Sequence, residues 1–136
     1  MRVVITGKPT SYSRPRVTKT HTYNPKAREK ESAAWEIKTE WNRPLLEGII
    51  ELYITFYIKI PTNISRKAQL NLNLKPVMKR PDLDNYIKFI LDAAQDIIYK
   101  DDSQIYRIHA EKLYSINPRT EMFVKEYHED IDYTLL

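Results

Sequence analysis

A strict alternation of apolar and polar residues marks the run "IIELYITFYIKI" near the middle of the chain. Successive side chains of a β-strand point to opposite faces, so a period of two residues predicts a strand, here over residues 49–60. One face of this strand would be wholly apolar: Ile50, Leu52, Ile54, Phe56, Ile58 and Ile60. The other face would carry Glu51, Tyr53, Thr55, Tyr57 and Lys59.

A helical period appears in the later run "DLDNYIKFILDAAQDIIY", residues 82–99. Its apolar residues recur three and four positions apart, as they do on the buried face of a helix: Leu83, Tyr86, Ile87, Ile90, Leu91, Ala94, Ile97 and Ile98. We therefore predict a helix over this run. Either Asp82 or Asp84 is expected to cap its start, where a carboxylate also favours the positive end of the helix dipole.

A second helix is predicted over residues 26–42, because the run "KAREKESAAWEIKTEWN" consists mainly of good helix formers. Asn24 and Pro25 would be its N-cap and its first helical residue. Its buried face is expected to be narrow and to consist of Ala27, Ala34, Trp35, Lys38 and Trp41.

Shorter patterns complete the expected fold. Strands are predicted over residues 2–7, 105–114 and 121–127, the second of them with Tyr106, Ile108, Ala110 and Tyr114 on one side. Residues 8–25 show no period and contain proline and serine, so an irregular extended segment is expected there, while residues 62–81 have room for one short helix. This order of strands and helices predicts an α+β domain with one sheet backed by helices.

Composition supports a folded chain and excludes several kinds of chemistry. The 136 residues suffice for one domain, and 42% hydrophobic with 29% charged residues suits a globular protein with a small core. The absence of cysteine excludes disulfides, thiolate zinc sites and cysteine nucleophiles. The first residues lack a signal-peptide pattern and no apolar run has the length of a membrane span, so we expect a cytoplasmic protein without a membrane partner.

Basic residues are distributed unevenly along the chain. The net charge of +4, from 22 Lys and Arg against 18 Asp and Glu, is too mild to indicate nucleic acid by itself. However, basic stretches at residues 1–30 and 59–80 accompany the densest group of aspartates. Candidate contacts to a DNA backbone are Arg14, Arg16, Lys19, Lys79, Arg80 and Lys100. For the arginine-containing stretch, solvation of a loop is an equally good interpretation.

Aspartates at both ends of the helix predicted over residues 82–99 are the candidate catalytic residues. Asp82 and Asp84 stand at its start, Lys88 lies one turn beyond Asp84 on the same face, and Asp101 and Asp102 follow its end. Each has an ordinary interpretation, as a helix cap, a surface ion pair or a polar turn. In combination, carboxylates are the ligands that Mg²⁺ prefers, and a lysine beside them stabilises negative charge developing on a phosphate. The set therefore predicts a metal-dependent phosphodiester hydrolase, on the condition that the two helix ends meet in space.

Three sequence blocks resemble one known family in the order in which they occur. "GKPTSYSRPRV" (7–17), "KRPDLDNYIKFILDA" (79–93) and "YKDDSQI" (99–105) are similar to the N-terminal segment, the central helix motif and the second acidic motif of RusA-type Holliday junction resolvases. These are small endonucleases of bacteria and their phages. The resemblance is loose over residues 62–79, and the C-terminal "EYHEDIDYTLL" has no counterpart in the family pattern.

The resemblance implies a single RusA-like endonuclease domain over residues 1–136, with a mixed sheet of about four strands. It implies a homodimer that depends on Mg²⁺, with Mn²⁺ as a possible substitute, and that resolves four-way DNA junctions by paired symmetric nicks in recombination and repair. Asp82 and Asp84 match the first two metal ligands, Lys88 the catalytic lysine, and Asp102 the third catalytic and metal-binding aspartate, with Asp101 beside it as the alternative. Two other functions stay open, a non-catalytic structure-specific DNA-binding protein and a hydrolase of small phosphorylated substrates.

Overall fold

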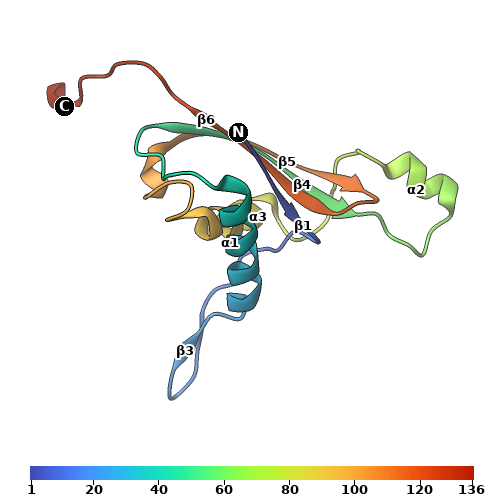
Figure 1. The fold of residues 1–136 in the computed structure, drawn as a ribbon. Helices are drawn as coiled ribbons and strands as arrows, with labels where there is room; N and C mark the ends of the chain where they lie inside the picture. The colour runs from blue at the N-terminus through green and yellow to red at the C-terminus, as the bar shows by residue number, and fades with distance from the viewer.

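A four-stranded sheet in the order β1-β6-β4-β5 lies at the centre of the computed structural model, which describes residues 1–136 (Figure 1). The strands are β1 (Arg2–Thr6), β4 (Ile50–Lys59), β5 (Ile105–Ser115) and β6 (Arg119–Glu126). β4 and β5 run parallel, whereas β6 lies antiparallel between β4 and β1. The predicted α+β class, with one mixed sheet of four strands backed by helices, is confirmed.

Two helices, α1 (Ala27–Trp41) and α3 (Leu83–Ala94), cover one face of this sheet (Figure 1). The apolar face of β4 points toward them as predicted, and none of its six residues from Ile50 to Ile60 exposes more than 8% of its surface. All of them except Ile60 form one core with Val3 of β1, Met122 of β6 and the inner faces of both helices. Removal of this apolar surface from water is the main force that holds α3 against the sheet.

The helix α3 ends five residues earlier than predicted. Its last residue is Ala94, and Asp96 then adopts a left-handed backbone conformation with φ of 66°. The amide of Asp96 donates to the carbonyl of Tyr99 at 2.7 Å, which closes a turn in place of another helical turn. Ile98 and Tyr99 are nevertheless fully buried, so the apolar period continued beyond the helix and concealed its end.

The helix α1 also differs from its prediction. It begins at Ala27, and Asn24 forms a turn before it by accepting from the amide of Lys26 at 2.9 Å. Its buried residues are Ala33, Ile37 and Trp41, so of the predicted face only Trp41 is correct. Trp35 is 70% exposed. The true buried line has a spacing of four residues, which the many charged residues between its members made hard to recognise.

The strand β5 contains an irregularity that the sequence pattern did not reveal. Its register with β4 shifts between Ile50 and Glu51, so that Ile105 pairs with Ile50 and Arg107 pairs with Glu51. A bulge of this kind advances the alternation of side chains by one residue. Tyr106 therefore lies on the opposite face from Ile108, contrary to the prediction, and its hydroxyl donates to Glu51 at 3.2 Å.

Three segments project from the sheet and its helices (Figure 1). The first is a hairpin of two short strands, β2 (Arg16–Val17) and β3 (Thr22–Tyr23), within the stretch predicted to be irregular. The second carries the short helix α2 (Arg66–Leu72), for which the sequence left room, and the third is the C-terminal tail that ends in η2 (Tyr133–Leu135). None of the helices combines the length and the apolar character needed to cross a bilayer.

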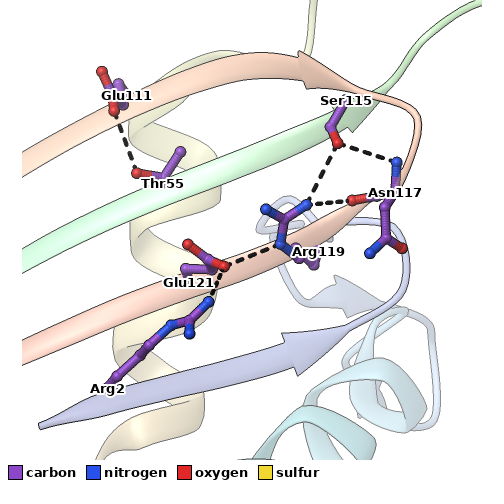
Figure 2. A network of polar contacts seen from close by, with 7 residues as sticks. All are labelled: Arg2, Thr55, Glu111, Ser115, Asn117, Arg119 and Glu121. Carbon is purple, nitrogen blue, oxygen red and sulfur yellow. Dashed lines mark hydrogen bonds and ion pairs between the residues drawn. The ribbon is translucent and has the colours of Figure 1, made fainter. Parts of the chain in front are cut away.

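The face of the sheet opposite α1 and α3, which we call the outer face, carries polar and aromatic side chains. Glu121 accepts hydrogen bonds from Arg2 and from Nε of Arg119, the latter at 3.1 Å (Figure 2). Arg119 also donates to the carbonyl of Asn117 at 2.8 Å and lies 3.8 Å from the centre of the Tyr57 ring. Partial burial alone would raise the pKa of Glu121, but the bonds from the two arginines outweigh it and lower that pKa.

A second group on the outer face surrounds Glu51, whose side chain is only 8% exposed. Its carboxylate accepts from the hydroxyls of Tyr53 and Tyr106, and the ring of His109 lies 3.4 Å away. The hydrogen bond from Tyr53 is the main reason that the pKa of Glu51 is lowered, with a further contribution from Arg107. The outer face is thus ordered by its own side chains, although no helix covers it.

Candidate active site

The start of α3 presents two carboxylates without partners. Asp82 is the N-cap residue by its backbone, with φ of −68° and ψ of 149°, but its side chain makes no capping hydrogen bond. Asp84, in the first turn, is exposed and takes part in no hydrogen bond or ion pair, so it does not pair with Lys88. The ordinary interpretations as a side-chain cap and a surface ion pair therefore do not describe these two residues. Both remain available to a ligand.

Lys88 lies one turn further along α3 and contacts an aromatic ring. Its ammonium is 4.1 Å from the centre of the ring of Tyr12, a cation–π geometry. The amide of Tyr12 also donates to the carbonyl of Asn85 at 2.9 Å, so the loop after β1 is bound to the same helix. The ring of Tyr86 stacks on Phe56 of β4 with 5.3 Å between ring centres. These contacts fix the start of α3 against both the loop and the sheet.

The two aspartates beyond α3 have different roles. Asp101 caps the short helix η1 (Asp102–Gln104), because its side chain accepts from the amide of Ser103 at 3.1 Å. Gln104 completes a reciprocal capping box by accepting from the amide of Asp101 at 3.0 Å. Asp102 is exposed and has no such structural bond. Of the two residues between which the sequence left a choice, Asp102 is the one whose carboxylate caps no helix.

Asp102 lies beside the buried Tyr99. The hydroxyl of Tyr99 donates to the carbonyl of Leu91 near the end of α3, at 2.5 Å. Burial raises the pKa of Tyr99 most, and the nearby charges of Asp102 and Asp92 raise it further. The position of Asp102 is therefore near residues 91 and 92 of α3, at the opposite end of the helix from Asp82 and Asp84.

The structure of one chain does not bring Asp82, Asp84 and Asp102 together. No group of three or more His, Asp and Glu side chains within residues 1–136 lies close enough to hold one metal ion. The helix α3 explains the separation, because its 12 residues span about 18 Å at a rise of 1.5 Å per residue. The condition that the aspartates from the two ends of the helix come together is therefore not met within one chain. Asp82 and Asp84 lie at the start of α3, and Asp102 lies near its end.

The pair at the start of α3 nevertheless has the chemistry of a magnesium site. Mg²⁺ in proteins often takes one or two carboxylates and fills its other positions with water and substrate phosphate. Asp82 and Asp84 are both exposed and unpaired, and they lie at the positive end of α3, with Lys88 one turn further along the helix. For Asp102 to join the same ion, it has to come from a second chain, or the chain has to change its conformation.

The basic candidates lie in three places. Arg14, Arg16 and Lys19 belong to the loop and hairpin after β1, all exposed, and the contacts of Tyr12 bind this loop to the start of α3. Lys79 and Arg80 are exposed directly before Asp82. Lys100 lies at the other end of α3, where it approaches Asp96 at 4.0 Å. Five of the six candidates thus accompany the Asp82–Asp84 pair, and Lys100 accompanies Asp102.

These residues lie on open surface. The main cavities of the structure are lined by none of Asp82, Asp84, Lys88 and Asp102. Enzymes that act on small molecules usually enclose them in a cleft, whereas a DNA duplex requires an accessible surface. The arrangement therefore favours DNA over a small phosphorylated substrate.

Comparison with known proteins agrees with this arrangement. The chain matches the family Endodeoxyribonuclease RusA over residues 6–125. It is also 30% identical over 138 residues to the uncharacterized protein YqaN of Bacillus subtilis (strain 168), an alignment that covers 93% of this chain and 96% of that protein. The chain belongs to the RusA endodeoxyribonuclease family, as the three sequence blocks indicated.

Two contacts in the candidate site have no signal in the sequence. Tyr12 as the partner of Lys88 and Tyr99 as the neighbour of Asp102 arise from packing between separate elements. No spacing rule within one element identifies such pairs.

Proposed function

We propose that this protein is a Mg²⁺-dependent endodeoxyribonuclease that resolves four-way DNA junctions by paired symmetric nicks, in DNA recombination and repair. The observation that supports it most is the pair of free carboxylates, Asp82 and Asp84, with Lys88 one turn away, in a chain of the RusA family. In an ordinary helix start these groups would be satisfied by a cap bond and an ion pair. Because the two carboxylates have no partner within the chain, they are available to bind a metal ion.

The proposed roles follow from the positions of the side chains. Asp82 and Asp84 hold the metal ion, and Asp102 is the third catalytic carboxylate. A bound Mg²⁺ polarises the phosphodiester and lowers the pKa of an attacking water. Lys88, held on the ring of Tyr12 instead of by a carboxylate, keeps its positive charge available to the phosphate and the leaving oxygen. Mn²⁺, which also accepts oxygen ligands, is expected to substitute.

The basic residues around this pair are proposed to bind the DNA backbone. Lys79 and Arg80 would hold the strand next to the carboxylates, while Arg14, Arg16 and Lys19 of the loop and hairpin after β1 would contact an adjacent arm. Lys100 would act near Asp102. Contacts of this type bind phosphates and give affinity that depends on salt, without reading sequence.

A homodimer is part of the proposal, because two opposed strands of a junction are related by a two-fold axis. The apolar face of β4 is buried in the core and is not available as an interface. The outer face remains, with Tyr53, Tyr106 and Phe123 each between 40% and 47% exposed. Exposed aromatic side chains on an uncovered sheet favour this surface as the interface.

A second function, binding of branched DNA without cleavage, is favoured by one observation. The three aspartates do not form a cluster within a chain. If they never meet, Asp82 and Asp84 could bind a cation only weakly, and the basic residues would still bind DNA. The two functions predict different behaviour on the same substrate.

Nicking of a synthetic four-way junction tests the proposal directly. Wild-type protein with Mg²⁺ should nick two opposed strands at symmetric positions and leave a linear duplex of the same sequence uncut. Asp84→Asn should lower the rate at least roughly 100-fold and retain junction binding, since a ligand but not a phosphate contact is removed. Asp130→Asn, in the exposed C-terminal tail, is the matched control and should nick normally. Tight binding by wild-type protein without Mg²⁺-dependent nicking would instead support the non-catalytic function.

A mixture of two inactive variants tests where Asp102 acts. When Asp84→Asn chains and Asp102→Asn chains form mixed dimers, a site that takes these residues from different chains is intact once per dimer. Nicking of one strand should then reappear. If each chain supplies its own complete site after a change of conformation, the mixture should stay inactive.

A further inference from the structure

Lys112 of β5 binds the chain directly before the proposed metal ligands. It pairs in register with Phe56, so it lies on the face of the sheet that the helices cover. Its ammonium donates to the carbonyl of Lys79 at 2.6 Å and to the carbonyl of Pro81 at 2.9 Å. Its own carbonyl accepts from the amide of Val77 at 3.1 Å. One residue of the sheet thus makes three hydrogen bonds to residues 77–81.

The backbone bonds along this edge of β5 stop before the aspartates. Leu74 and Tyr114 are joined by a backbone hydrogen bond of 2.8 Å, Tyr114 donates to Lys75 at 2.9 Å, and Pro76 forms a bridge with Leu113. After Val77, the side chain of Lys112 provides the hydrogen bonds that connect residues 78–81 to the sheet. The position of the backbone just before Asp82 therefore depends on this ammonium.

The carboxylates of Asp82 and Asp84 have no hydrogen bonds of their own to orient them. Lys112 forms no ion pair with either of them, so it holds the backbone and leaves both charges free. We infer that Lys112 is a positioning residue for the nuclease reaction, one that aims Asp82 by fixing the carbonyls of Lys79 and Pro81. This role rests on the proposed function, because it acts through Asp82.

A lysine suits this role because its ammonium has three donors and a long apolar stem. Two of these donors reach the carbonyls of Lys79 and Pro81 at the same time. Lys112→Met keeps the stem and removes the donors. Small displacements of a reacting group lower rates strongly, so we expect kcat to fall roughly 10- to 100-fold in this variant while KM for the junction changes little. Lys112→Arg, which retains donors, should recover a large part of the rate.

Amide hydrogen exchange measures the positioning without reference to catalysis. In Lys112→Met, peptides covering residues 76–86 should exchange faster, since the amides of Asn85 and Tyr86 bond to the carbonyl of Asp82 at 3.2 and 3.4 Å. Peptides of α1 should exchange as in the wild type. Lys38→Met is the matched control, because Lys38 is exposed on α1 and its ammonium has no partner. It should change neither the exchange nor the nicking.

Each outcome supports or overturns the inference. Amide hydrogen exchange over residues 76–86 that is unchanged in a folded Lys112→Met protein would overturn it. A kcat of Lys112→Met equal to that of the wild type would also overturn it. If Lys112→Met does not fold, Lys112→Arg decides: a folded but inactive Lys112→Arg protein would also overturn the inference. If wild-type protein does not nick junctions, the proposed function fails, yet faster exchange in Lys112→Met would still establish that this lysine holds the segment before Asp82.

Discussion

The ammonium of Lys88 lies 4.1 Å from the centre of the Tyr12 ring and makes no ion pair with Asp84, its neighbour one helical turn away. This contact joins the loop after β1 to the start of α3, since the amide of Tyr12 also donates to Asn85. It separates the positive charge of Lys88 from the carboxylates that precede it. The catalytic lysine and the metal ligands of the proposed site can therefore act on different atoms of one phosphate.

Replacement of Tyr12 should loosen Lys88. A cation–π contact at an exposed position contributes about 0.5–1 kcal/mol, so Tyr12→Ala should lower the single-turnover nicking rate roughly two- to fivefold. Tyr12→Phe keeps the aromatic face and should nick at nearly the wild-type rate. Equal rates for Tyr12→Ala and the wild type would show that the ring does not position the ammonium.

Asp101 and Asp102 should respond differently to substitution. Asp101→Ala removes the cap of η1 and should lower the free energy of unfolding by about 1 kcal/mol, with nicking retained at temperatures where the protein is folded. Asp102→Asn should leave the free energy of unfolding nearly unchanged and abolish nicking. Urea denaturation and a junction assay on both proteins measure the two effects. The reverse pattern would assign the catalytic role to Asp101.

The loop and hairpin after β1 should bind DNA through phosphates. Arg14→Ala should weaken binding to junctions of every sequence by a similar factor and reduce the slope of log K against log salt by about 1, as the loss of one phosphate contact requires. Arg43→Ala serves as the control, because the guanidinium of Arg43 lies over Trp41, away from the loop of Tyr12. Titrations at several salt concentrations measure the slope. Unaltered affinity in Arg14→Ala would remove this residue from the contact surface.

The acid sensitivity of the fold should depend partly on Glu121. Its pKa is lowered in the folded protein from an ordinary value of 4.5, so the ionised carboxylate contributes stability above about pH 4.5. This contribution is lost as the pH falls through the lower, folded pKa. Glu121→Gln should therefore be less stable than the wild type at pH 7, and the difference in free energy of unfolding should shrink below about pH 4.5. A difference that stays constant with pH would show that Glu121 stabilises the outer face by packing alone.

Much of the fold could be predicted because local periods report burial directly. The six apolar residues on one face of β4 are buried as their alternation indicated, and the α+β class followed from the order of elements. Errors occurred where the backbone departs from a regular repeat. Asp96 ends α3 by adopting a positive φ inside an apolar run, and the bulge opposite Glu51 turns Tyr106 away from the core. Neither the positive φ nor the bulge leaves a mark on the pattern of apolar and polar residues in its segment, so the sequence did not reveal either of them.

The residues of the candidate site could be found from the sequence, but their partners could not. Asp82, Asp84 and Lys88 were chosen because carboxylates suit a metal ion and a lysine on the same helix face suits a phosphate, whereas Asp102 was chosen by its position in the family motif. How those groups are held depended on contacts made by Tyr12, Tyr99 and Lys112. These three residues come from a loop, a turn and a distant strand.

The sequence by itself determined the main strands and helices, the family and the chemical groups available for the reaction, since each depends on residue type and short-range spacing. Tertiary structure alone decided that Asp82 and Asp84 are free, that Lys88 lies on Tyr12, and that Asp102 lies at the other end of α3. The physical reason is that a rigid helix of 12 residues sets the distance between its ends. Contacts across the sheet and loops then select which side chains meet.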